Sequence, residues 1–196
     1  MRRTSAPLLL TAAVSLVLTV LAAPGWSAPP TSPTSGVHFT QGGDPTCTLN
    51  ADDTVDCDAE LAGLGQGDIV VTATVQALAT YTCENRGGNQ APGQNKVAGP
   101  VVGSGEPTVI PSDQIDNGRA VVGDEAGPAT VAETVSGSTA GCPNGNWTGV
   151  DPQIVGYVVT FRASQGGTLL FCREGSTTEP GTVSLAACSS GGGVAR

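Results

Sequence analysis

Few side chains in this 196-residue chain have the chemistry for catalysis. The only histidine is His38 and the only lysine is Lys96. Nucleophilic triads need a histidine base, but His38 follows a proline-rich stretch, so we expect it to begin the first strand. Lys96 follows a loop of Gly, Pro, Gln and Asn, which offers no apolar shield to favour its neutral form. The sequence therefore assigns no catalytic residue, cofactor or metal ligand set.

Carboxylates are the one plentiful reactive group. Asp56, Asp58 and Glu60 alternate along one expected strand, with Asp52 and Asp53 in the turn before it. Side chains at this spacing share a face, where they could bind calcium, supply an acid pair for hydrolysis, or deter aggregation from an exposed edge. Sugar cleavage would also need aromatic platforms, and the chain has few aromatic residues.

Two segments rich in asparagine and glycine are candidates for binding. Residues 81–95 and 141–147 both contain Cys-x-Asn followed by glycine and asparagine. A bond between Cys83 and Cys142 would make the two loops neighbours and create a polar patch with one aromatic anchor. The candidate binding residues are Asn85, Arg86, Asn89, Gln90, Gln94, Asn144, Asn146 and Trp147. The alternative is that glycine and asparagine supply positive φ in turns, with Trp147 covering the core.

The six cysteines are expected to form up to three disulfides. An even number in an exported chain is typical of a disulfide framework, and six cysteines allow fifteen pairings. Zinc is disfavoured because there is no CxxC and only one histidine. Pairing of sequence neighbours predicts the bonds Cys47–Cys57, Cys83–Cys142 and Cys172–Cys188.

The elements that must position these residues are expected to be strands. Apolar and polar residues alternate from Ile69 to Cys83, the pattern of a strand with one buried face. Its fifteen residues would span about 50 Å, so we expect a bend or bulge near Ala77 and Leu78.

Two hairpins and several short strands complete the expected fold. Residues 47–57 fold about a turn at 51–53, and residues 157–163 turn at 164–167 into 168–173. Further short runs lie at 96–102, 108–110, 119–122, 131–135 and 183–188. About nine strands predict an all-β, two-layer antiparallel sandwich, immunoglobulin-like in general form, with a compact β-barrel as the alternative.

The N-terminal residues have the pattern of a secretory signal peptide. Arg2 and Arg3 precede an apolar stretch from Leu8 to Leu21 that is short for a membrane span. We expect a signal peptide at 1–27, a Pro/Ser/Thr-rich linker at 28–36, one β domain at 37–190 and a flexible tail at 191–196. The expected location is extracellular, with no membrane anchor after cleavage.

The charge disfavours two classes of partner. The net charge is −9, and loss of Arg2 and Arg3 with the signal peptide leaves six basic residues against 17 acids, or −11. Nucleic acids and anionic membranes need a basic face. An extracellular protein or a cell-wall polymer is the remaining kind of partner.

Several segments resemble uncharacterised small secreted proteins of actinobacteria. They are 62–65 (Ala-Gly-Leu-Gly), the Tyr-Thr-Cys-x-Asn at 81–85, the Gly-Gly-Asn-x-Ala-Pro-Gly-Gln-Asn at 87–95 and 141–144 (Gly-Cys-Pro-Asn). The resemblance implies export and brings no catalytic residue. The sequence thus predicts a non-catalytic extracellular binding or structural module. A secreted hydrolase using carboxylates and an inhibitor of an extracellular enzyme are the alternatives.

Overall fold

The regular structure is almost entirely antiparallel β. The computed structural model describes residues 36–91 and 96–189, and its single 3-10 turn is η1 (Ser112–Gln114). The strands are β1 (His38–Phe39), β2 (Thr46–Leu49), β3 (Val55–Ala62), β4 (Ile69–Asn85), β5 (Lys96–Ser104), β6 (Thr108–Ile110), β7 (Arg119–Ala126), β8 (Val135–Ser136), β9 (Trp147–Gln165), β10 (Thr168–Thr177), β11 (Gly181–Val183) and β12 (Ala186–Ala187). His38 begins the first strand, as predicted.

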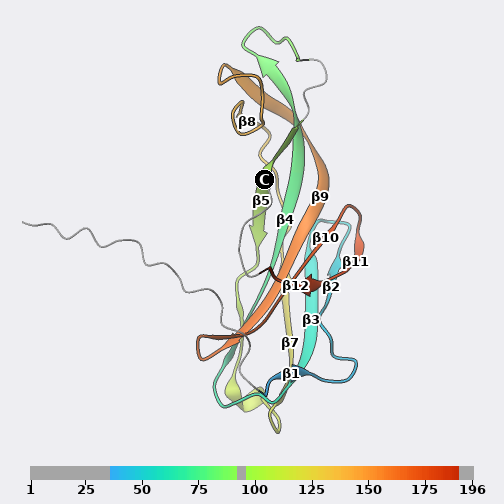
Figure 1. Cartoon of the computed structure of the whole chain (residues 1–196), viewed down its shortest axis with the longest axis vertical. Helices are drawn as coiled ribbons and strands as arrows, with labels where there is room; N and C mark the ends of the chain where they lie inside the picture. Colours follow the sequence, from blue (N-terminus) through green and yellow to red (C-terminus); the bar gives the residue numbers. More distant parts are fainter. Residues whose placement is uncertain (1–35, 92–95, 190–196) are drawn as a thin grey trace, which may run out of the picture.

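The strands form two sheets, which confirms the predicted two-layer arrangement. One sheet contains β1, β2, β3, β7 and β11, and the other runs β12-β10-β9-β4-β5 with β6 and β8 attached. The five-stranded sheet covers only the lower half of the seven-stranded sheet (Figure 1). The likeness to immunoglobulin domains is general, because the Cys47–Cys57 bond lies within one sheet instead of joining the two.

Strands β4 and β9 form the spine of the molecule. They pair along their whole length, from Ile69 opposite Gln165 to Asn85 opposite Trp147 (Figure 1). The predicted bend or bulge is confirmed, because the register shifts between Leu78 and Ala79. The first half of β9 was not predicted as a strand, since Pro152 and two glycines interrupt its alternation and pairing with β4 and β8 holds it extended.

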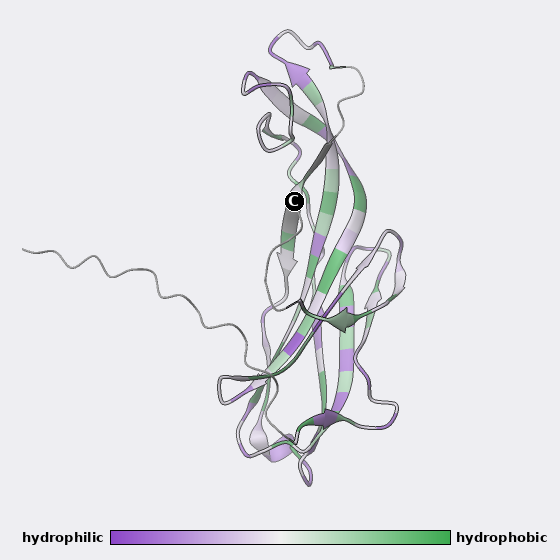
Figure 2. Ribbon diagram, in the orientation of Figure 1, coloured by the Kyte–Doolittle hydropathy of each residue, from purple (hydrophilic) through white to green (hydrophobic). Residues whose placement is uncertain are grey.

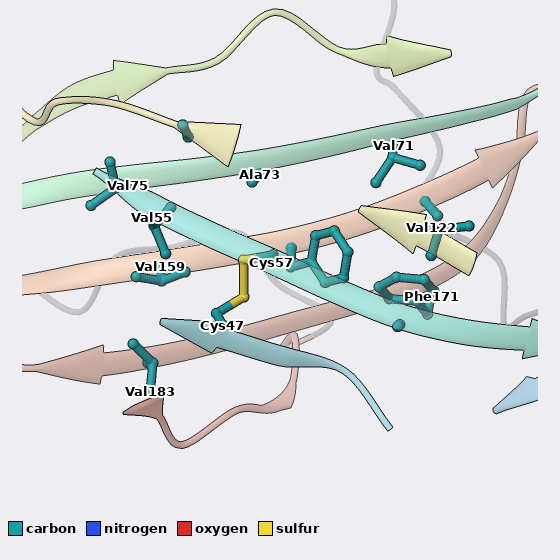
Figure 3. Packing of buried hydrophobic residues seen from close by; sticks show 14 of the residues in the cluster. Cys47, Val55, Cys57, Val71, Ala73, Val75, Val122, Val159, Phe171 and Val183 are labelled. Carbon is teal, nitrogen blue, oxygen red and sulfur yellow. A yellow bond between two sulfur atoms is a disulfide. The ribbon is translucent and has the colours of Figure 1, made fainter. Parts of the chain in front are cut away.

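The main core lies between the two sheets. Every second residue of β4 from Ile69 to Cys83 is buried, as the alternation predicted. Val75 and Val159 of one sheet face Val55 of the other beside the Cys47–Cys57 bond (Figure 3). Each such valine contributes about 1.5–3 kcal/mol relative to an exposed one.

Buried and exposed side chains also alternate along β3. Figure 2 shows hydrophobic and hydrophilic residues following one another along β3 and β4. In β3, Val55, Cys57 and Ala59 are buried, whereas Asp56 and Asp58 between them are exposed. This period of two sends one set of side chains into the sandwich and the other to solvent.

The turn between β2 and β3 is tied to the spine. The Tyr157 hydroxyl of β9 donates a hydrogen bond to the Asp53 carboxylate, although the two residues are 104 positions apart. Asp53 has a φ of 65°, and its carbonyl accepts a hydrogen bond of 3.0 Å from the Ala129 N–H. Next to it, Thr54 donates to Asp52, which lowers the pKa of that carboxyl.

A second, smaller core fills the upper half, where the five-stranded sheet is absent. It contains Ala79, Tyr81, Ala98 and Ala140, with Val131, Val135 and Cys142 packed against it. The prediction of a strand over 131–135 is wrong, since only β8 at its end is a strand. The Tyr81 hydroxyl donates to the Ala132 carbonyl at 2.8 Å, so the chain here covers β4 as an irregular segment.

The prediction of one strand over 183–188 is also wrong. β11 pairs with β2 in the five-stranded sheet, whereas β12 pairs with β10 in the seven-stranded sheet. Leu185, between the two strands, packs against the main core. The chain therefore crosses from one sheet to the other at this point, which the short alternation could not indicate.

All three predicted disulfide pairings are confirmed. The bonds join Cys47 to Cys57, Cys83 to Cys142 and Cys172 to Cys188. Three disulfides suit an oxidising environment. Within 36–91 and 96–189, no helix has the length and apolar character to span a membrane.

Candidate functional site

The two predicted binding loops meet at the far end of the spine. The Cys83–Cys142 bond joins residues separated by 59 positions, with their Cα atoms 5.7 Å apart. Beyond it, Asn85 at the end of β4 is paired with Trp147 at the start of β9. These strand ends lie at the top of Figure 1, above the part covered by the five-stranded sheet, and form what we call the tip (residues 84–91 and 142–148).

The first loop of the tip is shaped by Asn85. Its Oδ1 accepts hydrogen bonds from the backbone N–H of Gly87 at 2.9 Å and of Asn89 at 3.1 Å. The backbone adds bonds from Gly88 N to Asn85 O and from Asn85 N to Asn89 O. Gly88 has a φ of 73°, which a glycine adopts without strain. The loop is therefore fixed by its own hydrogen bonds.

The second loop is also held by an asparagine side chain. The Oδ1 of Asn144 accepts a hydrogen bond of 3.0 Å from Asn146 N, and Trp147 N donates to Asn144 O. A side chain at Gly137 would meet the Trp147 carbonyl oxygen at 2.4 Å, so this loop packs closely on the preceding turn. In both Cys-x-Asn motifs the asparagine side chain thus closes a turn. The alternative interpretation expected positive φ from asparagine and glycine and Trp147 over the core, but neither Asn85 nor Asn144 has a positive φ and Trp147 is not part of either core cluster.

Between the loops is an open hollow of about 460 Å³. Four of the eight candidate residues line it, together with Gly87: Asn85, Arg86, Asn89 and Asn146. Gln90, Asn144 and Trp147 belong to the tip but not to this lining, and Gln94 lies outside the described residues. The sequence did not single out Gly87, which has no side chain to suggest a role.

The hollow is rich in hydrogen-bond donors. The end of the Asn85 side chain faces two backbone N–H groups, which can only donate, so the atom there is the oxygen Oδ1. The Nδ2 group of Asn85 therefore remains available to donate to other partners. Arg86 is exposed and adds a guanidinium. No lining residue in the described part of the chain is acidic, although Glu84 is two positions from Arg86 along the chain.

The acids of β3 lie elsewhere and have structural partners. Asp58 accepts a hydrogen bond from Thr46 at 2.8 Å, and Asp56 accepts one from Asn50 at 2.9 Å. The expectation that they mark an exposed edge is wrong, because β3 pairs with β1 and β2 on one side and with β7 on the other. In the described parts of the chain, no three His, Cys, Asp or Glu side chains are grouped to hold a metal ion.

The two residues considered as bases each begin a strand. His38 is exposed, and its Nδ1 lies 2.9 Å from the Gly36 carbonyl oxygen, to which it donates. Lys96 is the first residue of β5, opposite Tyr81 of β4. Neither residue is assigned a chemical role.

A second hollow of about 500 Å³ lies at the opposite end of the molecule. It is lined by Leu64, Gly65, Gln66, Ser112, Asp113, Ile115 and Gly118. The Asp68 carboxylate accepts a bond from Ser112 N, and Gln165 bonds to the backbone of Gly65 and Gly67. These contacts hold the loop to the sheet, and a hollow at this end was not predicted.

Comparison with protein-family models and with curated proteins identifies no relative of this chain. No protein-family model matches the chain, and no curated protein matches it significantly. A function must therefore be argued from the tip itself.

Proposed function

We propose that the protein is a secreted, non-catalytic binding module whose binding surface is the tip. The observation that carries this proposal is the convergence of two hydrogen-bonded loops, locked by Cys83–Cys142, around a polar hollow at the end of a long strand pair. Loops held rigid before binding lose little conformational entropy when a partner binds. Donors in such a surface give orientation and specificity.

Export is part of the proposal. The pattern of residues 1–27 and the resemblance to secreted actinobacterial proteins support it, and the three disulfides suit the compartment it implies. The extracellular partner is expected to be a protein or a wall polymer, in keeping with the acidic chain.

The test uses tip residues that the fold does not need. Arg86 and Asn146 line the hollow, and their side chains make no hydrogen bond to other described residues. The double change Arg86→Ala with Asn146→Ala should leave the unfolding temperature unchanged. It should weaken retention of the purified protein by the washed cells or the supernatant components of the producing culture.

The matched control is Gln66→Ala with Asp113→Ala, two exposed residues of the hollow at the other end. This pair should bind like the unaltered protein. Equal retention of the tip variant and the unaltered protein would remove the tip from the proposal. Changing Asn85 or Asn144 is less informative, because their side chains shape the loops.

Inhibition of an extracellular enzyme is a second candidate, favoured by the rigidity of the first loop. Besides the bonds to Asn85, Ala91 N donates to Cys83 O at 3.0 Å, so the loop is closed at its base. An inhibitor would slow one enzyme of a panel of secreted hydrolases at a stoichiometric ratio, and the tip variant would not. A hydrolase using Asp56 and Asp58 gains no such support, since both are exposed and held by neighbours.

A further inference from the structure

Resting on the proposed function, we propose that the tip hollow binds a carboxylate-bearing polysaccharide, with Arg86 pairing with a carboxylate of the polymer. Among the described residues that line the hollow, Arg86 alone carries a charge. A guanidinium presents donors in a fork that matches the two oxygens of a carboxylate. The guanidinium of Arg86 therefore favours a ligand that carries carboxylates.

The amide of Asn85 presents the same polarity as Arg86. The two N–H groups that bind the Asn85 Oδ1 direct its acceptor into the loop and leave its Nδ2 hydrogens as donors. The Asn89 Nδ2 lies 3.4 Å from that same oxygen and uses one hydrogen there, which leaves its other hydrogen and its Oδ1 for a ligand. The donors of Arg86 and Asn85 fit a ligand that offers acceptors.

The lining favours a sugar polymer over a peptide. Within 36–91 and 96–189, its residues are three asparagines, one arginine and one glycine, with no apolar side chain. Peptide and protein partners usually bind through apolar or aromatic anchors that fill desolvated pockets. A chain of hydroxyl, ether and carboxylate oxygens can instead satisfy the amides and the guanidinium in an open hollow.

The acidic character of the rest of the protein does not oppose this ligand at the tip. Asp56, Asp58 and Glu125 lie on the outer face of the five-stranded sheet, which occupies the lower half of the molecule (Figure 1). Exposed charges are screened over about 8 Å at physiological ionic strength. The nearer carboxylate of Glu84 belongs to β4 and is not part of the lining.

The ligand class is tested with a pair of polymers that differ only at the carboxyl group. Binding of the disulfide-intact protein to immobilised polygalacturonate is compared with binding to the same polymer after methyl esterification, with alginate as a second uronate and poly-glutamate as an acidic peptide. Both uronates should bind, the ester should bind at least about tenfold more weakly, and added salt should weaken binding.

Variants then place the interaction at the tip. Arg86→Gln should weaken uronate binding by about tenfold to a hundredfold, whereas Arg119→Gln, the same change at an exposed site of the opposite end, should not. Equal binding to acid and ester, equal loss in both variants, or no binding to either uronate would overturn the proposal. Preference for poly-glutamate would overturn it in favour of an acidic peptide. If only the uronates fail while the tip double variant still loses its natural partner, the binding function stands and the ligand class is wrong.

Discussion

Tyr157 illustrates what a single side chain contributes to this fold. Its ring is buried in the main core, and its hydroxyl reaches the Asp53 carboxylate in the β2–β3 turn. Burial raises the pKa of Tyr157 to about 12, and the hydrogen bond to Asp53 adds to the shift. The folded protein thus favours the protonated phenol more than the unfolded chain does.

The stability of the protein should depend on this phenol at alkaline pH. The ordinary pKa of tyrosine is about 10, so between pH 10 and about 12 the unfolded chain loses the proton before the folded chain does. The free energy of unfolding should fall across this window. Below pH 10, Tyr157→Phe should cost about 1 kcal/mol, because the hydrogen bond is lost.

The measurement is denaturant unfolding of both proteins from pH 8 to pH 12. The advantage of the tyrosine protein over Tyr157→Phe should be full below pH 10 and should shrink as the pH approaches 12. If the free energies of unfolding of the two proteins change in parallel over the whole pH range, the Tyr157 hydroxyl does not cause the alkaline loss of stability.

At the scale of elements, the seven-stranded sheet has a gap that one carboxylate fills. On the side of β4 away from β9, β6 pairs with Ile69 to Val71 and β5 begins to pair at Thr74. In the gap, the Asp124 carboxylate of β7 accepts a hydrogen bond of 2.6 Å from Ala73 N and one of 2.7 Å from Thr108 Oγ1. Asp124 thus links the two sheets at a break in the strand pairing.

Removing this carboxylate should destabilise the fold. Ala73 is fully buried, so Asp124→Ala would leave its N–H unsatisfied and should cost about 1–3 kcal/mol. Asp124→Asn keeps one acceptor oxygen and should cost less. Asp44→Ala is the control: this acid is exposed, its side chain makes no hydrogen bond to other described residues, and the change should stay within about 0.5 kcal/mol of the unaltered protein. Equal unfolding energies for Asp124→Ala and the control would contradict the bridging role.

At the scale of the whole molecule, the protein consists of a sandwich and an extension. The main core lies between the sheets, while the small core around Tyr81 supports the tip beyond them. β4 and β9 pass through both parts (Figure 1). Of the three disulfides, only Cys83–Cys142 lies in the extension, so it should control the tip more than the sandwich.

Removal of Cys83–Cys142 by serine substitution should therefore act locally. Hydrogen exchange should accelerate at the amides of Gly88 and Ala91, while β3 keeps its protection. The matched control, serine at Cys172 and Cys188, should leave exchange at the tip unchanged. Uniform acceleration through the sandwich in the first variant would show that the extension is not an independent unit.

The sequence by itself determined the elements whose signal is local. Alternation over Ile69 to Cys83 gave the central strand, because burial of one face imposes a period of two. The two hairpins followed from turn formers between alternating runs, and the pairing of Cys47 with Cys57 followed from the symmetry of the first hairpin. These features depend on residues close together in the chain.

Only the tertiary structure decided which distant groups meet. It divided 183–188 between two sheets, kept 148–156 extended against β4, and brought Asp124 to the gap beside Ala73. At the tip it directed the Asn85 oxygen into the loop and left Arg86 and Asn146 at the hollow. The N–H groups that orient Asn85 belong to its own loop, whereas Asn146 comes from the second loop, which the pairing of β4 with β9 brings alongside. The candidate residues could be named from the sequence, but their separation into loop-shaping and lining residues could not.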